Sequence, residues 1–253
     1  MANVSESNRF SGASPRVIGH RGAAGHAPEN TLASIRKAAE LGATWVEFDV
    51  KLSADGVPVL CHDDTLERTT DGRGRVAART ARELARLDAG GWFDPAFAGE
   101  PLPTLDAALA QLAALGLGAN VEIKPCPGRE AETGYVAAAA LAADWPSSLP
   151  EPLISSFSTA ALNAAAGAAP AIPRALLVYG VPVDWRGMVD DLRCVALHAQ
   201  SRRLRRATAK AALATGMALR VYTVNRPGRA RQLMGWGVDA IITDYPDRIL
   251  SAL

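Results

Sequence analysis

The chain has 253 residues, of which 49% are hydrophobic, and its formal net charge is +1. A chain of this length can bury one large core, and a charge near zero gives no global field that would attract nucleic acid or an anionic membrane. The three cysteines are too few, and odd in number, for a disulfide scaffold.

The first residues carry no targeting or membrane-spanning signal. Residues 1–15 are polar and small, without the apolar segment of a signal peptide. No apolar run in the chain approaches the ~18 residues of a membrane span. We therefore expect a flexible tail at 1–15, a single domain at 16–253, a cytoplasmic location and no stable membrane association.

Residues 16–50 are predicted to form the first β-α-β unit. An apolar run at 16–19 favours a strand, and the Trp, Val and Phe residues at 45–50 favour the next one. Between the two strands, Asn30 or Thr31 can cap a helix whose apolar residues have helical spacing.

Two carboxylates, Glu47 and Asp49, occupy alternate positions of the second predicted strand. Because alternate side chains of a strand point to the same face, both carboxylates face the same way. They repel each other unless a proton or a cation lies between them, and oxygen ligands of this kind suit Mg²⁺ or Ca²⁺. This segment alone leaves open the alternative of an edge strand with two solvated acids.

Residues 57–62 are also strand-like, but they follow the second strand too closely for a parallel crossover, which needs a dozen or more residues. We therefore predict a hairpin with Asp55-Gly56 at its turn, which returns His62 roughly opposite Asp49. The alternation of strands and helices then breaks down. Residues 50–103 are expected to supply this hairpin and a small inserted lobe. The lobe is expected to cap one end of the barrel that the remaining strands predict.

Regular alternation resumes after the lobe. Strands are predicted at 119–124, 153–156, 174–178, 194–197, 219–224 and 240–243, and helices at 103–115, 130–142, 159–168, 207–215 and 226–236. With the hairpin set aside, the predicted strands number eight. Eight parallel strands with helices between them close into a (β/α)8 TIM barrel, so the fold class is α/β.

In parallel α/β folds, functional groups gather at the carboxyl ends of the strands. The residues predicted to lie there are His20, Arg21, Glu47, Asp49, His62, Glu122, Lys124, Tyr222 and Asn225. The three carboxylates, Glu47, Asp49 and Glu122, can form a cage for one divalent cation, Mg²⁺ or Ca²⁺. Burying so many charged groups in one cleft costs folding free energy, so such a cluster indicates a functional site.

The cations and histidines of this set complete a chemical interpretation. Arg21 and Lys124 offer charge-assisted contacts to a phosphate. His20 and His62 can supply a base and an acid near neutral pH. With a metal to polarise a phosphoryl oxygen, the combination is suited to phosphodiester cleavage.

Several short motifs follow one another along the chain. They are His20-Arg21-Gly22, Pro28-Glu29-Asn30-Thr31, Glu47-Phe48-Asp49, Asp55-Gly56-Val57-Pro58, His62-Asp63, Glu122-Ile123-Lys124, Ser155-Ser156-Phe157, Tyr222-Thr223-Val224-Asn225, Gly237-Val238-Asp239 and Thr243-Asp244-Tyr245-Pro246. In this order and spacing they resemble the glycerophosphodiester phosphodiesterase family, and its bacterial cytosolic members in particular. The resemblance covers about residues 17–249.

The resemblance implies a barrel with an insertion after its second strand and metal-dependent hydrolysis of a small-molecule glycerophosphodiester. Implied substrates are glycerophosphocholine and glycerophosphoethanolamine, and implied products are sn-glycerol 3-phosphate and an alcohol. The implied roles are metal binding by Glu47, Asp49 and Glu122, general acid–base catalysis by His20 and His62, and phosphate binding by Arg21 and Lys124. Tyr222 stands where the family usually has Trp, and it is expected to border the glycerol.

Other polar residues are interpreted as structural. This group contains Cys61, His26, His198, Asp239 and Asp244. Glu29 and Asn30 are expected to fix the loop before the first helix, and Asp63 is either solvated or orients an imidazole. The arginine-rich run at 202–206 is expected to be a solvated surface rather than a nucleic-acid site, because the net charge is low and no aromatic residues interrupt the run.

The sequence is also compatible with two other functions. One is a lysophospholipase D-like phosphodiesterase on the same barrel, and the other is a non-catalytic barrel that binds a phosphate ligand. The sequence is compatible with a homodimer, and it does not decide between Mg²⁺ and Ca²⁺ because the same oxygen ligands serve both ions.

Overall fold

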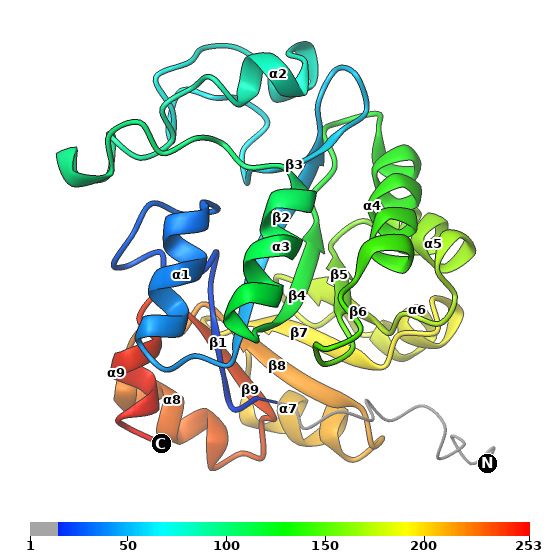
Figure 1. Cartoon of the computed structure of the whole chain (residues 1–253). Helices are drawn as coiled ribbons and strands as arrows, with labels where there is room; N and C mark the ends of the chain where they lie inside the picture. The colour runs from blue at the N-terminus through cyan, green and yellow to red at the C-terminus, as the bar shows by residue number, and fades with distance from the viewer. Residues whose placement is uncertain (1–14) are drawn as a thin grey trace.

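The computed structural model describes residues 15–253, so the predicted tail lies, except for Pro15, outside the described residues. A ring of parallel strands forms the centre of this part of the chain (Figure 1). The ring consists of β1 (Val17–Gly19), β2 (Trp45–Leu52), β4 (Gly118–Ile123), β5 (Leu153–Ser156), β6 (Arg174–Val178), β7 (Ala196–Gln200), β8 (Ala218–Tyr222) and β9 (Ala240–Thr243). Strand β1 pairs in parallel with both β2 and β9, which closes the barrel. The predicted TIM barrel is therefore confirmed.

Helices surround the strands on the outside of the ring. They are α1 (Leu32–Glu40), α3 (Leu105–Leu115), α4 (Glu130–Asp144), α5 (Thr159–Ala168), α6 (Trp185–Asp191), α7 (Arg206–Leu213), α8 (Pro227–Met234) and α9 (Pro246–Leu250). The sequence did not predict α6 or α9, which have 7 and 5 residues, because such short helices hold too few turns to display apolar periodicity. None of the helices within 15–253 is long and apolar enough to cross a membrane.

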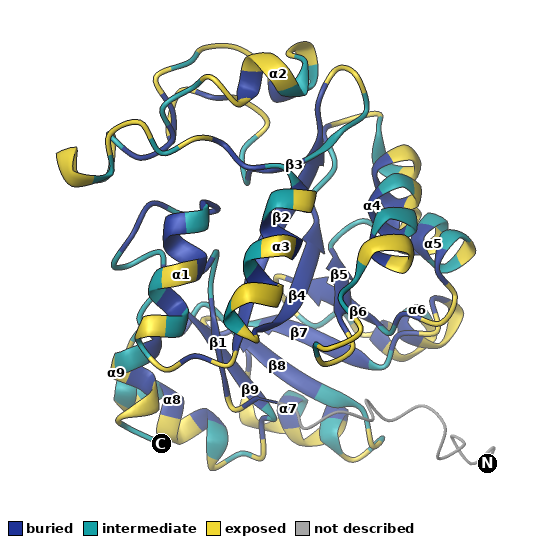
Figure 2. Ribbon diagram, viewed as in Figure 1, coloured by how far each residue is buried: buried dark blue, intermediate teal, exposed yellow. Residues whose placement is uncertain are grey.

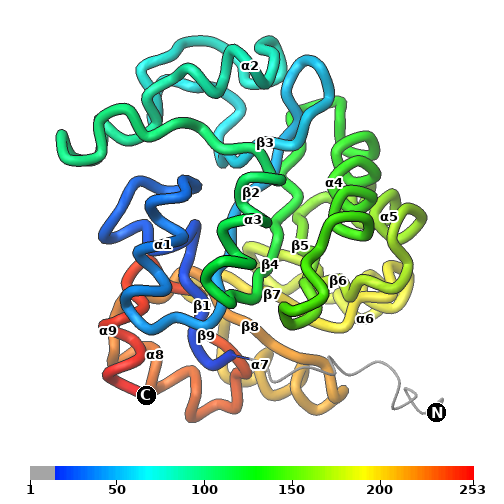
Figure 3. The backbone as a smooth tube through the Cα atoms, viewed as in Figure 1, coloured from blue at the N-terminus to red at the C-terminus, as the bar shows by residue number. Residues whose placement is uncertain are grey.

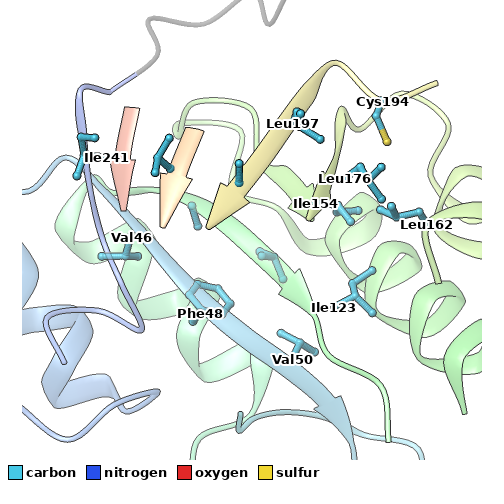
Figure 4. Close-up of a cluster of buried hydrophobic side chains, with 14 of the residues drawn as sticks. Val46, Phe48, Val50, Ile123, Ile154, Leu162, Leu176, Cys194, Leu197 and Ile241 are labelled. Carbon is cyan, nitrogen blue, oxygen red and sulfur yellow. The ribbon is translucent and has the colours of Figure 1, made fainter. Parts of the chain in front are cut away.

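Alternation along the strands divides the core into two layers. The outward side chains Val46, Phe48 and Val50 of β2 pack with those of neighbouring strands against the helices (Figure 4). Trp45, one position out of phase, belongs to a separate cluster inside the barrel, with Leu153 among its neighbours. Figure 2 accordingly shows buried strands and helices that expose only their outer faces. The same alternation directs the two β2 carboxylates into the barrel.

The predicted hairpin is present, and it returns His62 to within one residue of the position opposite Asp49, as expected. Strand β3 (Pro58–Leu60) pairs antiparallel with the end of β2. The N–H of Cys61 donates to the carbonyl of Asp49 at 3.1 Å, so Cys61 lies opposite Asp49 and His62 comes one residue later. The turn needs Gly56 at φ +77°, in the left-handed region that glycine favours.

The chain after β3 forms a loop-rich lobe above the barrel before it returns to α3 (Figure 3). The lobe contains two short 3₁₀ turns, Val76–Ala78 and Pro95–Phe97, and helix α2 (Ala81–Leu84). It has a small core of its own, which includes Leu66, Leu84 and Leu102. The expected insertion after the second strand thus stands at the carboxyl end of β2, where it can influence the site.

Candidate active site

Three buried carboxylates converge at the carboxyl ends of β2 and β4. Glu47 and Asp49 lie on β2, and the parallel register sets Asp49 beside Glu122 of β4. One oxygen from each carboxylate lies within 4.8 Å of the others, an arrangement that can hold a metal ion. Glu47 Oε1 is buried and has no hydrogen-bond partner. An oxygen left in this state is costly unless it binds a cation, so the residues fit the predicted divalent ion.

The protonation of the trio reflects crowded negative charge. Burial and then the charge of Asp49 raise the pKa of Glu47 well above its usual value, and the same two causes raise the pKa of Glu122 to about 7. Burial acts in the same direction on Asp49, but Arg21 and Lys124 outweigh it and hold its pKa at about 2. Asp49 is therefore the permanent anion of the trio, and a cation would displace protons from the other two carboxylates.

His20 follows β1 and faces the trio. Its Nδ1 lies 2.6 Å from Asp244 Oδ1, and its Nε2 lies 3.9 Å from Glu47 Oε2. Asp244 is held in turn by the side-chain amide of Asn225, which donates to Asp244 Oδ2 at 2.5 Å. Asp244 was predicted only to fix the last loop, but it also orients a candidate catalytic imidazole.

His62 has a carboxylate partner of its own. Its Nδ1 lies 2.6 Å from Asp63 Oδ1, so Asp63 orients the imidazole and the solvated alternative is wrong. Burial lowers the pKa of His62, and Arg21 and Lys124 contribute in the same direction. The imidazole is therefore biased toward its neutral form, in which a free nitrogen can accept a proton.

Arg68, which sequence reasoning missed, links the lobe to this histidine. Its Nε donates to Asp63 Oδ2 at 2.5 Å, and Nη1 and Nη2 each donate to Glu29 at 2.8 Å. Glu29 also accepts from Arg21 Nη1 at 2.6 Å. One planar guanidinium thus joins the loop after β1 to the pair of His62 and Asp63.

Replacing Arg68 by Gln is expected to lower kcat by roughly tenfold, the effect of about one charge-assisted hydrogen bond, because Asp63 loses the group that aligns it. Steady-state kinetics measures the change. Arg82→Gln is the matched control, since Arg82 is exposed on the same lobe and makes no ion pair among residues 15–253. Equal kcat values for the two variants would contradict a positioning role for Arg68.

The two residues predicted to bind phosphate, Arg21 and Lys124, flank the trio. Arg21 has φ +49°, and its N–H donates to Glu47 Oε2 at 3.0 Å. Its Nε lies 3.2 Å from Asp49 Oδ2, while Lys124 Nζ donates to Glu122 Oε1 at 2.9 Å and lies 3.8 Å from Asp49 Oδ1. Both cations therefore stand where a phosphate bound at the trio would meet them.

In the loop before α1, Thr31 caps the helix and Asn30 fixes the loop to β2. Thr31 caps the helix by accepting from the N–H of Ser34 at 3.1 Å. Asn30, at φ +58°, donates to Asp49 Oδ2 at 2.9 Å and accepts from the Asp49 N–H at 3.0 Å. The loop thus fixes a metal-ligand candidate as well as the start of a helix.

An aromatic wall closes the side of the site toward β5, β6 and β8. Phe157 stacks on Tyr179 at 4.5 Å and meets Tyr222 edge to face at 6.0 Å. The hydroxyl of Tyr222 donates to the carbonyl of Val178 at 3.0 Å, which fixes its ring. Phe157 and Tyr179 line a cavity of about 580 Å³ together with His62 and Lys124. This cavity is large enough for a small organic ligand.

The side chains of the remaining residues expected to be structural are not part of the acidic trio or of its histidine pairs. Burial raises the pKa of the Cys61 thiol to about 12, so it stays protonated and packs in the core. His26 Nε2 lies 2.8 Å from Asp247 Oδ1, and Asp239 accepts from the N–H of Leu219. His198 is fully buried inside the barrel.

Comparison with known proteins gives consistent matches across the chain. The model of the family described as "Glycerophosphoryl diester phosphodiesterase family" matches residues 20–248. A glycerophosphodiester phosphodiesterase of Caldanaerobacter subterraneus is 33% identical over 242 residues, which cover 93% of this chain and 96% of the relative.

Solved structures agree with this match. A phosphodiesterase of Oleispira antarctica, in complex with the product sn-glycerol-3-phosphate, has a TM-score of 0.91 and 41% identity, with coverage of 94% of this chain and 96% of that one. A glycerophosphodiester phosphodiesterase of Agrobacterium tumefaciens has a TM-score of 0.77 and 31% identity, with coverage of 94% and 99%.

Proposed function

Since the chain belongs to the glycerophosphoryl diester phosphodiesterase family, we propose that it hydrolyses glycerophosphodiesters by metal-dependent general acid–base catalysis with His20 and His62. The enzyme class, phosphoric diester hydrolase, follows from the family itself. The metal, the residues that carry the reaction and the substrates are what we propose beyond this class.

The observation that carries the proposal is the pair of histidines around one acidic trio. Each imidazole has its Nδ1 bound to a carboxylate at 2.6 Å, His20 to Asp244 and His62 to Asp63. Fixing Nδ1 leaves Nε2 as the nitrogen that can exchange a proton with the substrate. Two such groups supply the base and the acid that phosphodiester cleavage needs, one for the attacking oxygen and one for the leaving alcohol.

Glu47, Asp49 and Glu122 are proposed to hold one divalent ion, Mg²⁺ or Ca²⁺. The buried, unpartnered Glu47 Oε1 and the all-oxygen donor set support this assignment. A bound divalent ion would supply positive charge that polarises a phosphoryl oxygen and acidifies a hydroxyl or water. Arg21 and Lys124 are proposed to neutralise the remaining phosphate charge through charge-assisted hydrogen bonds.

The proposed products are sn-glycerol 3-phosphate and a free alcohol, from substrates such as glycerophosphocholine and glycerophosphoethanolamine. The Oleispira antarctica phosphodiesterase, whose complex contains sn-glycerol-3-phosphate, supports this assignment. The cavity lined by Phe157 and Tyr179 opens beside Lys124, and Tyr222 borders it through Phe157. We propose that the aromatic wall packs against the carbon chain of the glycerol, while Lys124 holds the phosphate.

Metal removal tests the proposal directly. The purified protein is expected to release glycerol 3-phosphate from glycerophosphocholine with Mg²⁺ or Ca²⁺, and EDTA is expected to reduce turnover to background until the ion is restored. An enzyme-coupled assay for glycerol 3-phosphate measures the rate. Release that persists in EDTA would contradict metal dependence. Turnover of lysolipids alone would favour the lysophospholipase D-like alternative, and tight binding without turnover would favour a binding protein.

A further inference from the structure

A second cavity, of about 730 Å³, lies at the same end of the barrel as the candidate active site. Its lining comes from the turns that follow β7 and β8, with Ser201, Arg202 and Leu204 from the first turn and residues 223–226 from the second. Three arginines, Arg202, Arg226 and Arg229, contribute to its wall. The arginines at 202–206 are exposed, as expected, and Arg202 among them borders this cavity.

The positive charge of this cavity is not neutralised by the protein. Within residues 15–253, no carboxylate forms an ion pair with Arg202, Arg226 or Arg229. The two cations of the candidate active site, in contrast, each form an ion pair: Arg21 with Glu29 and Lys124 with Glu122. A concave surface lined by one sign of charge concentrates ions of the opposite sign.

Arg229 is fixed in place by groups that carry no net charge. Its Nη2 donates to the carbonyl of Ser201 at 2.6 Å, and its Nε donates to the Ser201 hydroxyl at 3.2 Å. Its guanidinium also lies 4.8 Å from the centre of the Trp236 ring. Partial burial lowers the pKa of Arg229, because it removes water from the charged guanidinium. No neighbouring carboxylate among the described residues offsets this effect, and a bound anion would.

Two hydrogen-bonded side chains, Asn225 and Asp244, lie between the cavity and His20. Asn225 lines the cavity and donates to Asp244 at 2.5 Å. Asp244 in turn lies 2.6 Å from His20 Nδ1. A ligand in the cavity therefore lies on the far side of Asn225 from the histidine that faces the acidic trio.

We propose that this arginine-lined cavity binds a phosphate group carried by the leaving alcohol. Diesters whose alcohol is itself phosphorylated would then be preferred substrates. Guanidinium groups suit this task because they bind phosphate oxygens in a bidentate manner. The inference rests on the proposed function, since it assigns the substrate class of that same site.

The test compares two substrates that differ only in the terminal phosphate: glycerophosphoglycerol and glycerophosphoglycerol phosphate. The double variant Arg202→Gln/Arg226→Gln is expected to raise KM for the phosphorylated substrate about tenfold, and to leave KM for glycerophosphoglycerol within about twofold. The control is Arg205→Gln/Arg206→Gln, which removes the same charge from exposed positions of the same run that do not line the cavity. The control is expected to affect both substrates equally and weakly.

Three outcomes would overturn the inference. The first is an equal rise in KM for both substrates in the cavity variant, and the second is the same selectivity in the control variant. The third is that the two substrates have equal KM values in the wild type, while inorganic phosphate changes the rate with glycerophosphoglycerol. The cavity would then bind free phosphate and not a phosphate carried by the substrate. If the wild type hydrolyses neither substrate, the proposed function fails. Calorimetric binding of the two compounds then still tests the cavity.

Discussion

Replacing His20 by Gln is expected to lower kcat for glycerophosphocholine by about 10²–10⁴-fold, the range that positioned acid–base groups contribute. Glutamine is polar and of similar length, but it cannot take up and release a proton at neutral pH. His20 Nε2 lies 3.9 Å from Glu47 Oε2, at the edge of the acidic trio, so the substitution removes proton transfer where the phosphate would bind. Steady-state kinetics at saturating metal measures the loss, and KM is expected to change little.

His26→Gln provides the matched control for this prediction. His26 also pairs with a carboxylate, since its Nε2 lies 2.8 Å from Asp247 Oδ1, but it packs against Tyr245 outside the acidic trio. Its replacement is expected to leave kcat within about twofold of the wild type, because surface substitutions rarely have large effects. A wild-type rate in His20→Gln, or an equal loss in His26→Gln, would show that His20 is not an acid–base residue.

The barrel was predictable because its strands are short apolar runs at regular spacing. Strands β5 and β9 have the predicted bounds, Leu153–Ser156 and Ala240–Thr243. Strand β7 begins two residues later than expected, at Ala196, because an apolar run does not by itself mark where pairing begins. The hairpin could be placed only roughly, with His62 opposite Asp49 to within one residue, because the turn geometry decides which residues pair and the sequence specifies it only loosely.

The residues expected at the carboxyl ends of the strands could be assembled because a parallel barrel brings all these ends to one edge. The groups that orient these residues could not be predicted in the same way. Asp244 lies 224 residues from His20 in the chain, and Arg68 lies 39 residues from Glu29. Such contacts depend on barrel closure and on the path of the inserted lobe, and neither has a local pattern. The Thr243-Asp244 motif at the end of β9 was the available signal for Asp244, since β9 pairs with β1.

The metal site gives the second large expected effect. Asp49→Asn and Glu122→Gln are each expected to lower metal-dependent kcat by at least about 10²–10³-fold, the cost of removing a main electrostatic group from a reaction centre. Each variant also replaces a charged ligand by a neutral one, so the metal concentration for half-maximal rate is expected to rise. Titration of the rate with Mg²⁺ and Ca²⁺ measures both changes. Wild-type metal dependence in either variant would exclude that carboxylate as a ligand.

The same two variants are expected to change the stability of the metal-free protein in opposite directions. The pKa of Asp49 is held at about 2 by Arg21 and Lys124 against the effect of burial. Asp49→Asn therefore removes a favourable charge, at a cost of roughly 2 kcal/mol near neutral pH. Glu122 is the reverse case, because burial and Asp49 raise its pKa to about 7. Glu122→Gln removes a carboxylate that resists ionisation, and it is expected to stabilise the metal-free fold above pH 7.

The pH dependence fixes the sign of the Glu122 effect. A raised folded pKa contributes stability that is fully present below the unfolded value of 4.5 and is lost as pH rises through about 7. In EDTA, the free energy of unfolding of Glu122→Gln minus that of the wild type should therefore grow between about pH 5 and pH 8. The difference cancels contributions common to both proteins, such as the lowered pKa of His62. Saturating metal should reverse the order at pH 8, because only the wild type retains the full trio. A difference that does not vary with pH would mean that the pKa of Glu122 is not raised in the folded protein, contrary to this prediction.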